Sequence, residues 1–376
     1  MSTVPTSAEI VIVGGGAIGA SIAYHLARRG ARGVVVLDRA ELGSGSTGRA
    51  SGGIRQQFPS EIEVRLARES VRFWERFEEQ TGGNLDFQKV GYLYLLRSEN
   101  ELAQFELNVA MQNDLQVPSR MLTPNEVGVI VPDLCLTGVL GGTFCPTDGR
   151  AVPQGAVDGF AHAARDAGVV FCERVGVERI DIQGGAIRGV ATTHGFLQVS
   201  TVINATGPHA ADLIAAIGIR LPVFPRRMHQ FVTGPLSGMV GTLPCVVEPA
   251  TSLFVAPEGN GILLGLNRDE PSSHDLTVDW DFLPHVVETA ARVLPLLLDA
   301  DIRSAWAGSV ELTPDGLPIV EASSSVRGLV LANGFNGHGF MWSPAIGRVV
   351  SELILDGALR DLDLAPFALA RFVDGA

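Results

Sequence analysis

The sequence predicts a two-domain protein, with a discontinuous α/β domain interleaved with a second domain that is rich in short strands. Three observations predict this fold. The sequence opens with a strand–helix–strand pattern, and strand–helix patterns return in its middle and near its end. Two stretches rich in short strands separate these three regions. Because no low-complexity linker divides the chain, two interleaved domains fit the pattern better than two consecutive ones.

The first strand–helix–strand pattern occupies residues 10–38. A β-branched run at 10–13 precedes a segment at 17–29 whose apolar residues recur with helical spacing, and 34–37 is a second β-branched run. The helical crossover makes the two strands parallel. The first turn reads GGGAIG, which is GxGxxG spacing, and Asp38 ends the second strand.

This turn has the context that a dinucleotide-binding turn requires, so the domain is predicted to be Rossmann-like. The three glycines permit a tight turn, close approach to a pyrophosphate, and close packing of helix on strand. The helix N-terminus favours the anion, and the Asp38 carboxylate is expected to accept from ribose hydroxyls. The turn alone leaves NAD and FAD open. The predicted cofactor contacts here are Gly14, Gly16, Ala17, Ile18, Gly19, Asp38 and Arg39.

A second glycine-rich stretch, GSGSTGRASGGIR, occupies residues 43–55. It holds five glycines, four serines or threonines, and two arginines, Arg49 and Arg55, without regular periodicity. One interpretation is a flexible loop. The other is a backbone-rich cradle for an extended part of a cofactor, in which the two arginines supply fixed positive charge.

The remaining elements follow in order. An amphipathic helix is predicted at 61–79, a strand within VGYLYLLRS, and a polar helix from about residue 99. Helix-then-strand texture returns after residue 149, and strand-like runs follow between 177 and 203. The stretch 220–313 holds many short strands and one helix near 279–293. A buried strand, LVLANG, then leads through GFNGHGF into a final helix expected to begin at Ser343 and Pro344.

These elements set the predicted domain boundaries. Residues 1–84, 147–216 and 326–376 are assigned to the nucleotide-binding domain. Residues 85–146 and 217–325 are assigned to the strand-rich second domain, which the family resemblance described below identifies as the substrate-binding domain.

Composition argues against several other classes. The formal net charge of −13 disfavours nucleic acid and anionic membrane surfaces as partners. No apolar stretch approaches the ~20 residues of a membrane span. The four cysteines lack metal-ligand spacing, so no metal is expected. The N-terminus does not read as a signal peptide, which favours the cytoplasm.

With these motifs, the chain resembles the D-amino-acid oxidase (DAO) superfamily of FAD-dependent oxidoreductases. It is most similar to the branch of the sarcosine oxidase beta subunit, glycine oxidase and amine dehydrogenases. The resemblance covers essentially the whole chain. The motifs, in order, are VIVGGGAIGASIAYHLARRG, GSTGRASGGIR, VINATG, WAGSVELTPDGLPIV and ANGFNGHGFMWSPAIGR.

The resemblance implies an FAD-binding domain of the two-dinucleotide-binding type, covered by an antiparallel-sheet domain that shapes the substrate pocket. It implies oxidation of a C–N bond in a small amine or amino acid by hydride transfer to flavin N5, then imine hydrolysis. Further FAD contacts are implied in the later motifs, in the second glycine-rich stretch and at Val175. They are Gly45, Ser46, Thr47, Arg49, Ala50, Ser51, Gly52, Val175, Ala205, Thr206, Gly207, Gly308, Gly334, Asn336, Gly337, His338, Gly339, Phe340 and Met341.

Departures from the family pattern shape the mechanism. Gly308 stands where some relatives attach FAD through cysteine, so FAD is expected to be noncovalent. Leu263 and Met341 stand where relatives have lysines, the former one that activates oxygen. Val310 replaces a carboxylate-binding arginine. Either O2 or an electron-acceptor partner therefore remains open as the oxidant.

Five residues are candidates for catalysis: Arg55, His229, Asn267, Gly337 and His338. Arg55 either binds a substrate carboxylate through a bidentate fork or holds a flavin or protein carbonyl. His229 either faces the pocket as a proton acceptor or is a half-buried structural residue. The Gly337 backbone and the following helix are expected to stabilise negative charge on reduced flavin. His338 is either catalytic or a hydrogen-bonding residue of the turn, and Asn267 replaces a substrate-side histidine.

The predicted pocket walls are Arg55, Phe254, Leu263 and Trp306. Tyr92 and Tyr94 are further aromatic candidates, although aromatics on strands usually belong to a core. The chain is thus expected to be an amine or amino-acid oxidoreductase acting on a small molecule. A flavoprotein subunit of a multicomponent dehydrogenase and a regulatory flavoprotein without turnover are the alternatives. Homo- and hetero-oligomers both remain open.

Overall fold

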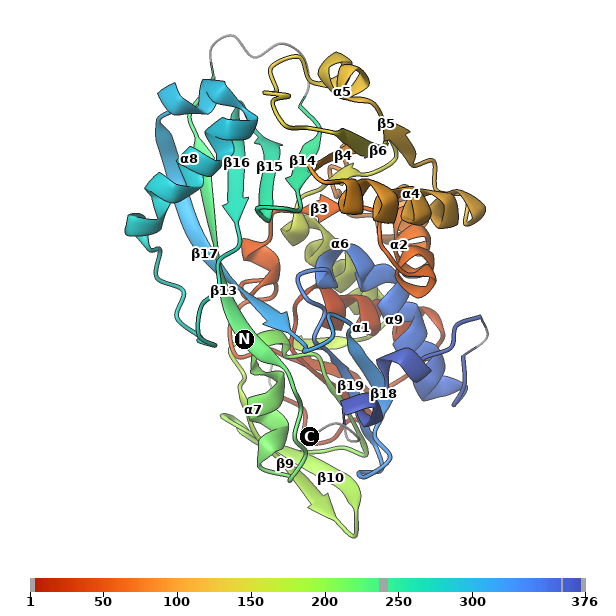
Figure 1. Ribbon diagram of the computed structural model, residues 1–376. Helices are drawn as coiled ribbons and strands as arrows, with labels where there is room; N and C mark the ends of the chain where they lie inside the picture. The colour runs from red at the N-terminus through yellow and green to blue at the C-terminus, as the bar shows by residue number, and fades with distance from the viewer. Residues whose placement is uncertain (1–3, 237–242, 360, 373–376) are drawn as a thin grey trace.

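The computed structural model describes residues 4–236, 243–359 and 361–372 (Figure 1). Its first sheet has six strands in the order β18-β19-β12-β1-β2-β8. Neighbours pair in parallel except for β18 and β19, which are antiparallel. The strands come from three separate parts of the sequence. Their bounds are β1 Ile10–Val13, β2 Val34–Leu37, β8 Val170–Cys172, β12 Thr201–Asn204, β18 Ile319–Ala322 and β19 Leu329–Asn333.

Both faces of this sheet are buried, which explains its β-branched strands. Ile10 and Ile12 of β1 point to the face covered by helices, and Val11 and Val13 point to the other. The covering helices are α1 (Ala17–Arg28), α2 (Glu61–Trp74), α6 (Pro153–Asp166) and α9 (Gly339–Leu355). The other face packs on α7 (Ala210–Ala215) and on the antiparallel strands β9 (Val177–Gln183), β10 (Ala186–Thr192) and β11 (Gly195–Gln198).

Helices α1 and α9 lie side by side although they come from opposite ends of the sequence, as the red and blue helices of Figure 1 show. Gly347 of α9 makes this possible, because a Cβ added there would lie 2.3 Å from Ser21 Oγ on α1. The close approach sets the glycine turn before α1 beside the glycine turn before α9. Two motifs more than three hundred residues apart in sequence therefore open into one region of the molecule.

The second large sheet has eight strands in the order β17-β13-β16-β15-β14-β4-β6-β5. Its pairs are antiparallel except for β14 and β4, which are parallel. It combines strands from both segments predicted for the substrate domain. Their bounds are β4 Tyr92–Leu96, β5 Arg120–Leu122, β6 Gly141–Cys145, β13 Phe224–Thr233, β14 Cys245–Glu248, β15 Leu253–Glu258, β16 Gly261–Leu266 and β17 Ile302–Leu312.

The two faces of this sheet have different coverings. One packs on α5 (Pro124–Ile130) and α8 (Leu283–Val293) in an aliphatic core. The other presents Tyr92, Tyr94 and Phe254, and α4 (Glu99–Asp114) covers part of it through Leu102 and Phe105. Apart from short 3-10 helices, the remaining described elements are α3 (Phe77–Thr81) and the short pair β3 (Gly53–Ile54) and β7 (Gly149–Arg150). None of the described helices combines the length and apolar character that a bilayer crossing requires.

Two elements differ from the sequence prediction. Helix α9 begins at Gly339, with His338 as its N-cap, so Pro344 lies inside the helix rather than at its first position. The glycine turn passes directly into helix because residues 339–343 already form its first turn. In addition, β18 joins the six-stranded sheet, so sheet membership changes between β17 and β18 and not at residue 325.

Candidate active site

The turn from β1 into α1 forms a cradle that fits an anion. Gly14 has a φ of 107°, and a Cβ added there would lie 2.3 Å from the Ala205 carbonyl oxygen. The N-cap of α1 is Gly16, so no side chain caps the helix, and its first turn holds no acidic residue. Thr47 Oγ1 accepts from the Ala17 N–H at 3.0 Å. Other N-terminal amide donors of α1 remain for a phosphate group.

Asp38 sits at the end of β2 and borders the same cradle. Its Oδ2 accepts from the Gly15 N–H at 2.7 Å and its Oδ1 from the Ala40 N–H at 2.8 Å. Burial raises the pKa of this carboxyl, and the two amide donors oppose that shift. Each oxygen keeps capacity for a second donor, which fits a ribose hydroxyl. The Nη2 atom of Arg39, which follows Asp38, lies 2.6 Å from His209 Nε2.

The second glycine-rich stretch folds over the cradle and is tied to β17. Ser46 Oγ donates to the Ser309 carbonyl at 2.6 Å, and Trp306 Nε1 donates to the Arg49 carbonyl at 3.0 Å. The Arg49 guanidinium donates to the carbonyls of Ser44 and Gly45. Trp306 therefore anchors this loop and does not line the pocket described below, contrary to the sequence prediction.

The C-terminal turn, GFNGHGF, is held in a left-handed backbone conformation. Gly334, Asn336 and Gly337 have φ of 73°, 52° and 84°. Asn336 tolerates this conformation because its side chain bonds locally. Its Oδ1 accepts from the Thr313 N–H at 2.9 Å, and its Nδ2 donates to the Gly334 carbonyl at 2.6 Å and to Thr313 Oγ1 at 3.0 Å.

A carboxyl that the sequence analysis did not single out also holds this turn. Glu311 of β17 accepts from the Phe335 N–H through Oε1 at 3.3 Å, and its carbonyl accepts from the Asn336 N–H at 2.9 Å. Burial raises the pKa of the Glu311 carboxyl to about 7, while the N–H groups of Gly334 and Phe335 act in the opposite direction. In the sequence, this glutamate could have been found only from its position two residues before the TPDG motif.

A pocket of about 550 Å³ lies next to the second glycine-rich stretch. The second glycine-rich stretch and the C-terminal turn form one side of it. The aromatic face of the eight-stranded sheet and helix α4 form the other. Ten residues that the sequence analysis named line the pocket: Ala50, Ser51, Gly52, Arg55, Phe254, Asn267, Gly337, His338, Phe340 and Met341. Other lining residues include Gln57, Phe58, Tyr92, Tyr94, Gln104, Phe105, Asn108 and Gln112.

Arg55 is the one charged side chain among the described residues that line this pocket. Its guanidinium carbon lies 3.8 Å from the centre of the Phe58 ring, a cation–π contact. One terminal nitrogen donates to the Gln57 carbonyl, and the other lies 2.9 Å from His338 Nε2. Burial, reinforced by Arg55, holds the pKa of His338 well below its usual range. The imidazole is therefore neutral, and its Nε2 accepts from the arginine.

His229 is not at the pocket, and the structure contradicts the prediction that it faces the substrate. It shares a face of β13 with Phe231, which packs in the core under α8. Its Nε2 accepts from the Asp279 N–H at 3.1 Å, and burial lowers its pKa. Leu263, also predicted at the pocket, is fully buried within β16 and is not part of the lining. The sequence did not show which face of the sheet lines the pocket, because both faces carry apolar residues and the alternation along the strands does not distinguish them.

The other predicted cofactor contacts border the cradle as follows. Ala205, Thr206 and Gly207 follow β12, and Val175 donates its N–H to the Asp38 carbonyl at 2.7 Å. A Cβ added at Gly308 would lie 3.1 Å from Arg49 Cβ. Helix α4, which lines the pocket opposite the C-terminal turn, is predicted from the sequence only as a polar helix. Its four pocket residues carry no motif that would have identified them.

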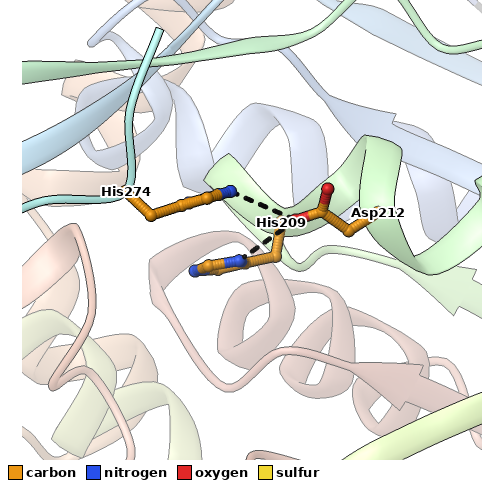
Figure 2. A group of neighbouring side chains, drawn as sticks. All are labelled: His209, Asp212 and His274. Atoms are coloured by element: carbon orange, nitrogen blue, oxygen red, sulfur yellow. Dashed lines mark ion pairs between the residues drawn. The ribbon is translucent and has the colours of Figure 1, made fainter.

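A cluster on the molecular surface resembles a metal site in composition. His209 Nδ1 and His274 Nε2 lie 3.4 Å and 3.2 Å from the same oxygen of Asp212 (Figure 2). The two rings are stacked, with centres 4.2 Å apart and planes within 9°. A metal ion must lie in the plane of each ligating imidazole, and two parallel stacked planes share no such point. The described arrangement therefore fits ion pairing to Asp212 and not metal ligation.

Comparison with known proteins agrees with this geometry. The family described as "FAD dependent oxidoreductase" (DAO) matches residues 9–353. The chain belongs to the DAO family of FAD-dependent oxidoreductases. FAD is accordingly its cofactor, and the cradle residues described above fit it. The predicted family, fold class and cofactor are thereby confirmed.

Individual DAO relatives cover the chain almost completely. The crystal structure of L-proline dehydrogenase from P. horikoshii shares 34% identity and a TM-score of 0.93, covering 99% of both chains. Glycine oxidase from Geobacillus kaustophilus shares 27% identity and a TM-score of 0.87, covering 98% of this chain and 99% of that one. Human mitochondrial sarcosine dehydrogenase is 27% identical over 98% of this chain, which spans 42% of that protein's length. The chain thus spans well under half of this curated relative.

Asn336 provides a test of the C-terminal turn. We expect Asn336→Ala to lower FAD affinity about 10- to 100-fold, because it removes side-chain hydrogen bonds worth about 1–3 kcal/mol and leaves alanine at positive φ. Asn336→Gly should fall between the two proteins, since it relieves the strain alone. FAD dissociation constants from fluorescence titration measure this. Asn125→Ala, an exposed change on α5, should match the unaltered protein. Equal affinities for Asn336→Ala and Asn125→Ala would show that the turn does not contribute to FAD binding.

Proposed function

We propose that this DAO-family protein oxidises the C–N bond of a small amino acid, and that imine hydrolysis follows. FAD, when bound, supplies the hydride acceptor. The observation that carries the proposal is the guanidinium of Arg55, which is the one charged group among the described side chains that line the pocket beside the C-terminal turn. A lone cation in such a pocket favours a substrate that carries a carboxylate.

The geometry of Arg55 suits that role. Phe58 and the Gln57 carbonyl fix the guanidinium, and neutral His338 adds no competing charge. Two of the five N–H donors are thus engaged, and the others remain for a carboxylate. No lining residue is a carboxylate that would pair with a substrate ammonium. The pocket therefore favours the neutral amine, which is the form whose nitrogen lone pair assists hydride loss. The side-chain amide of Asn267 lines the pocket and is proposed to orient it.

The turn and α9 are suited to stabilise negative charge that develops on the cofactor. No side chain caps α9, and its first turn holds no acidic residue. The amide donors at its N-terminus, near Gly337, remain for an acceptor. Because these donors are fixed before reaction, they stabilise charge without reorganisation. Gly337 and His338 are thus proposed to act through backbone position and neutrality, and Asn267 through orientation of the substrate.

A second candidate function is a dehydrogenase that passes electrons to a partner, as one subunit of a larger assembly. The side chains at positions 263 and 341 favour it, because neither places an ammonium group by the pocket to activate oxygen. Similarity to an L-proline dehydrogenase and a sarcosine dehydrogenase also supports it. A regulatory flavoprotein without turnover is the remaining alternative.

Anaerobic substrate titration tests the main proposal. We expect L-proline, sarcosine, glycine or a D-amino acid to bleach the visible absorbance of the FAD-loaded protein, because hydride transfer reduces it. Admission of air then separates the two candidates: rapid recovery of colour indicates an oxidase, and slow recovery a dehydrogenase. If dithionite bleaches the protein but no member of the amine and amino-acid panel does, the regulatory alternative replaces both.

Replacement of Arg55 tests carboxylate recognition. For a bleaching amino acid such as L-proline, we expect Arg55→Met to raise the apparent Kd about 100-fold, from the loss of charge-assisted hydrogen bonds of about 1.5–3 kcal/mol. Arg55→Lys should recover part of the affinity, since it keeps the charge but not the fork. Pyrrolidine, which lacks the carboxylate, provides the control and should bind all three proteins alike. A weakened affinity for FAD, with the substrate Kd unchanged, would instead assign Arg55 to the cofactor.

Noncovalent FAD is proposed from the absence of a suitable thiol. None of the four cysteines, all within the described residues, lines the pocket. A side chain at Gly308 would be crowded by Arg49. Precipitation with acid should therefore release all of the yellow colour into the supernatant, measured by its absorbance. Colour retained in the washed pellet would show a covalent bond.

A further inference from the structure

A second groove lies on the layer of helices that covers the six-stranded sheet. It has a volume of about 360 Å³ and runs between helices α1, α2 and α9. Its lining shares no residue with the substrate pocket. The lining residues are Tyr24, His25, Arg28, Glu69, Arg72, Phe73, Arg76, Gln80, Pro344 and Arg348.

The groove is basic in a strongly acidic protein. Its charged lining consists of four arginines and one glutamate, whereas the whole chain carries a net charge of −13. Helix α2 extends the positive surface along one face, because Arg65, Arg68 and Arg72 recur at spacings of three and four. Burial lowers the pKa of Arg68, and repulsion from Arg72 and Arg65 adds to that shift. The arginines thus crowd one another, a cost that an anionic partner would offset.

Part of this charge has no carboxylate partner. Arg348 pairs with Glu69 at 2.5 Å, and Arg76 pairs with Glu79 at 2.8 Å. Neither Arg28 nor Arg72 has an ion pair within the described residues, and both side chains are exposed. These two arginines are therefore the available positive charges of the groove.

Aromatic contacts connect the groove with the substrate pocket. Phe73 lines the groove and contacts Trp74, with ring centres 6.1 Å apart. Trp74 stacks on Phe340 at 5.5 Å, and Phe340 lines the pocket. Trp74 Nε1 also donates to the Met341 carbonyl at 3.1 Å, which ties α2 to the start of α9. Two ring contacts, Phe73 with Trp74 and Trp74 with Phe340, thus link the lining of the groove to the lining of the pocket.

We propose that the groove between α1, α2 and α9 is the docking site for an anionic electron acceptor. This inference rests on the dehydrogenase form of the proposed function. Two electrons leave the reduced cofactor for the acceptor, as one two-electron or two one-electron equivalents, and the proton bound on reduction is released to solvent. Arg28 and Arg72 attract the acceptor's negative charge, and Tyr24 and Phe73 supply the apolar floor of the contact.

Small redox probes of opposite charge test this without an identified partner. The FAD-loaded protein is titrated to full reduction with dithionite and mixed in stopped flow with ferricyanide or with hexaammineruthenium(III). At low salt we expect Arg28→Glu/Arg72→Glu to slow reoxidation by ferricyanide about 10-fold and to accelerate reoxidation by the cationic complex. Both differences should shrink in 0.5 M salt, where the Debye length falls to roughly 4 Å.

Matched variants make the outcome decisive. Arg179→Glu/Arg188→Glu introduces the same charge change at exposed positions of β9 and β10, away from the groove, and should alter both rates less than twofold. Arg28→Gln/Arg72→Gln gives half the charge change if the double glutamate variant folds poorly. Equal effects of the groove and control variants, or no effect of either, would overturn the proposal. Dithionite reduces the protein here in place of a substrate. If no amino acid bleaches the FAD-loaded protein, that result contradicts the proposed function but leaves this test of the groove intact.

Discussion

The close contact between α1 and α9 is the constraint on which the site depends. Gly347 lets the two helices approach until Ser21 and His25 fill the space that a side chain would need. Each helix follows a glycine turn, and neither is capped by a hydrogen bond from the side chain of its N-cap residue. Packing the helices together thus places two sets of uncapped amide donors at one end of the six-stranded sheet. One set suits the phosphates of FAD, and the other is proposed for its reactive end.

The polar chemistry of the pocket depends on which groups are kept neutral. Burial keeps the His338 imidazole uncharged, so Arg55 is the one charged group among the described side chains that line the pocket. Around the C-terminal turn, Glu311 and Asn336 hold the backbone through local hydrogen bonds. The chain thus uses rigid backbone and one cation in this region, where some of its relatives use lysine or cysteine.

Sequence reasoning predicted the local features that depend on backbone conformation. Gly14 and Gly337 have the positive φ their turns require, and the βαβ unit with its parallel pairing is as predicted. It failed where the outcome depended on which face of a sheet is covered. His229 was placed at the pocket, yet it faces the core under α8, because the eight-stranded sheet is apolar on both sides. The pocket residues of α4 were missed because they carry no motif and reach the site only through tertiary packing. The exact domain boundaries stay a prediction.

The side of the pocket formed by α4 is built from a different part of the chain than the side formed by the glycine-rich turns. Helix α4 starts with its own capping box, formed by Ser98 and Glu101, and contributes four side chains to the lining. The cofactor cradle takes no residue from it. Substitutions on the inner face of this helix are therefore free to reshape substrate preference while FAD binding is preserved. The architecture separates the part of the molecule that can diversify from the part that cannot, and α4 is the natural place to redirect the enzyme toward larger or differently shaped amines.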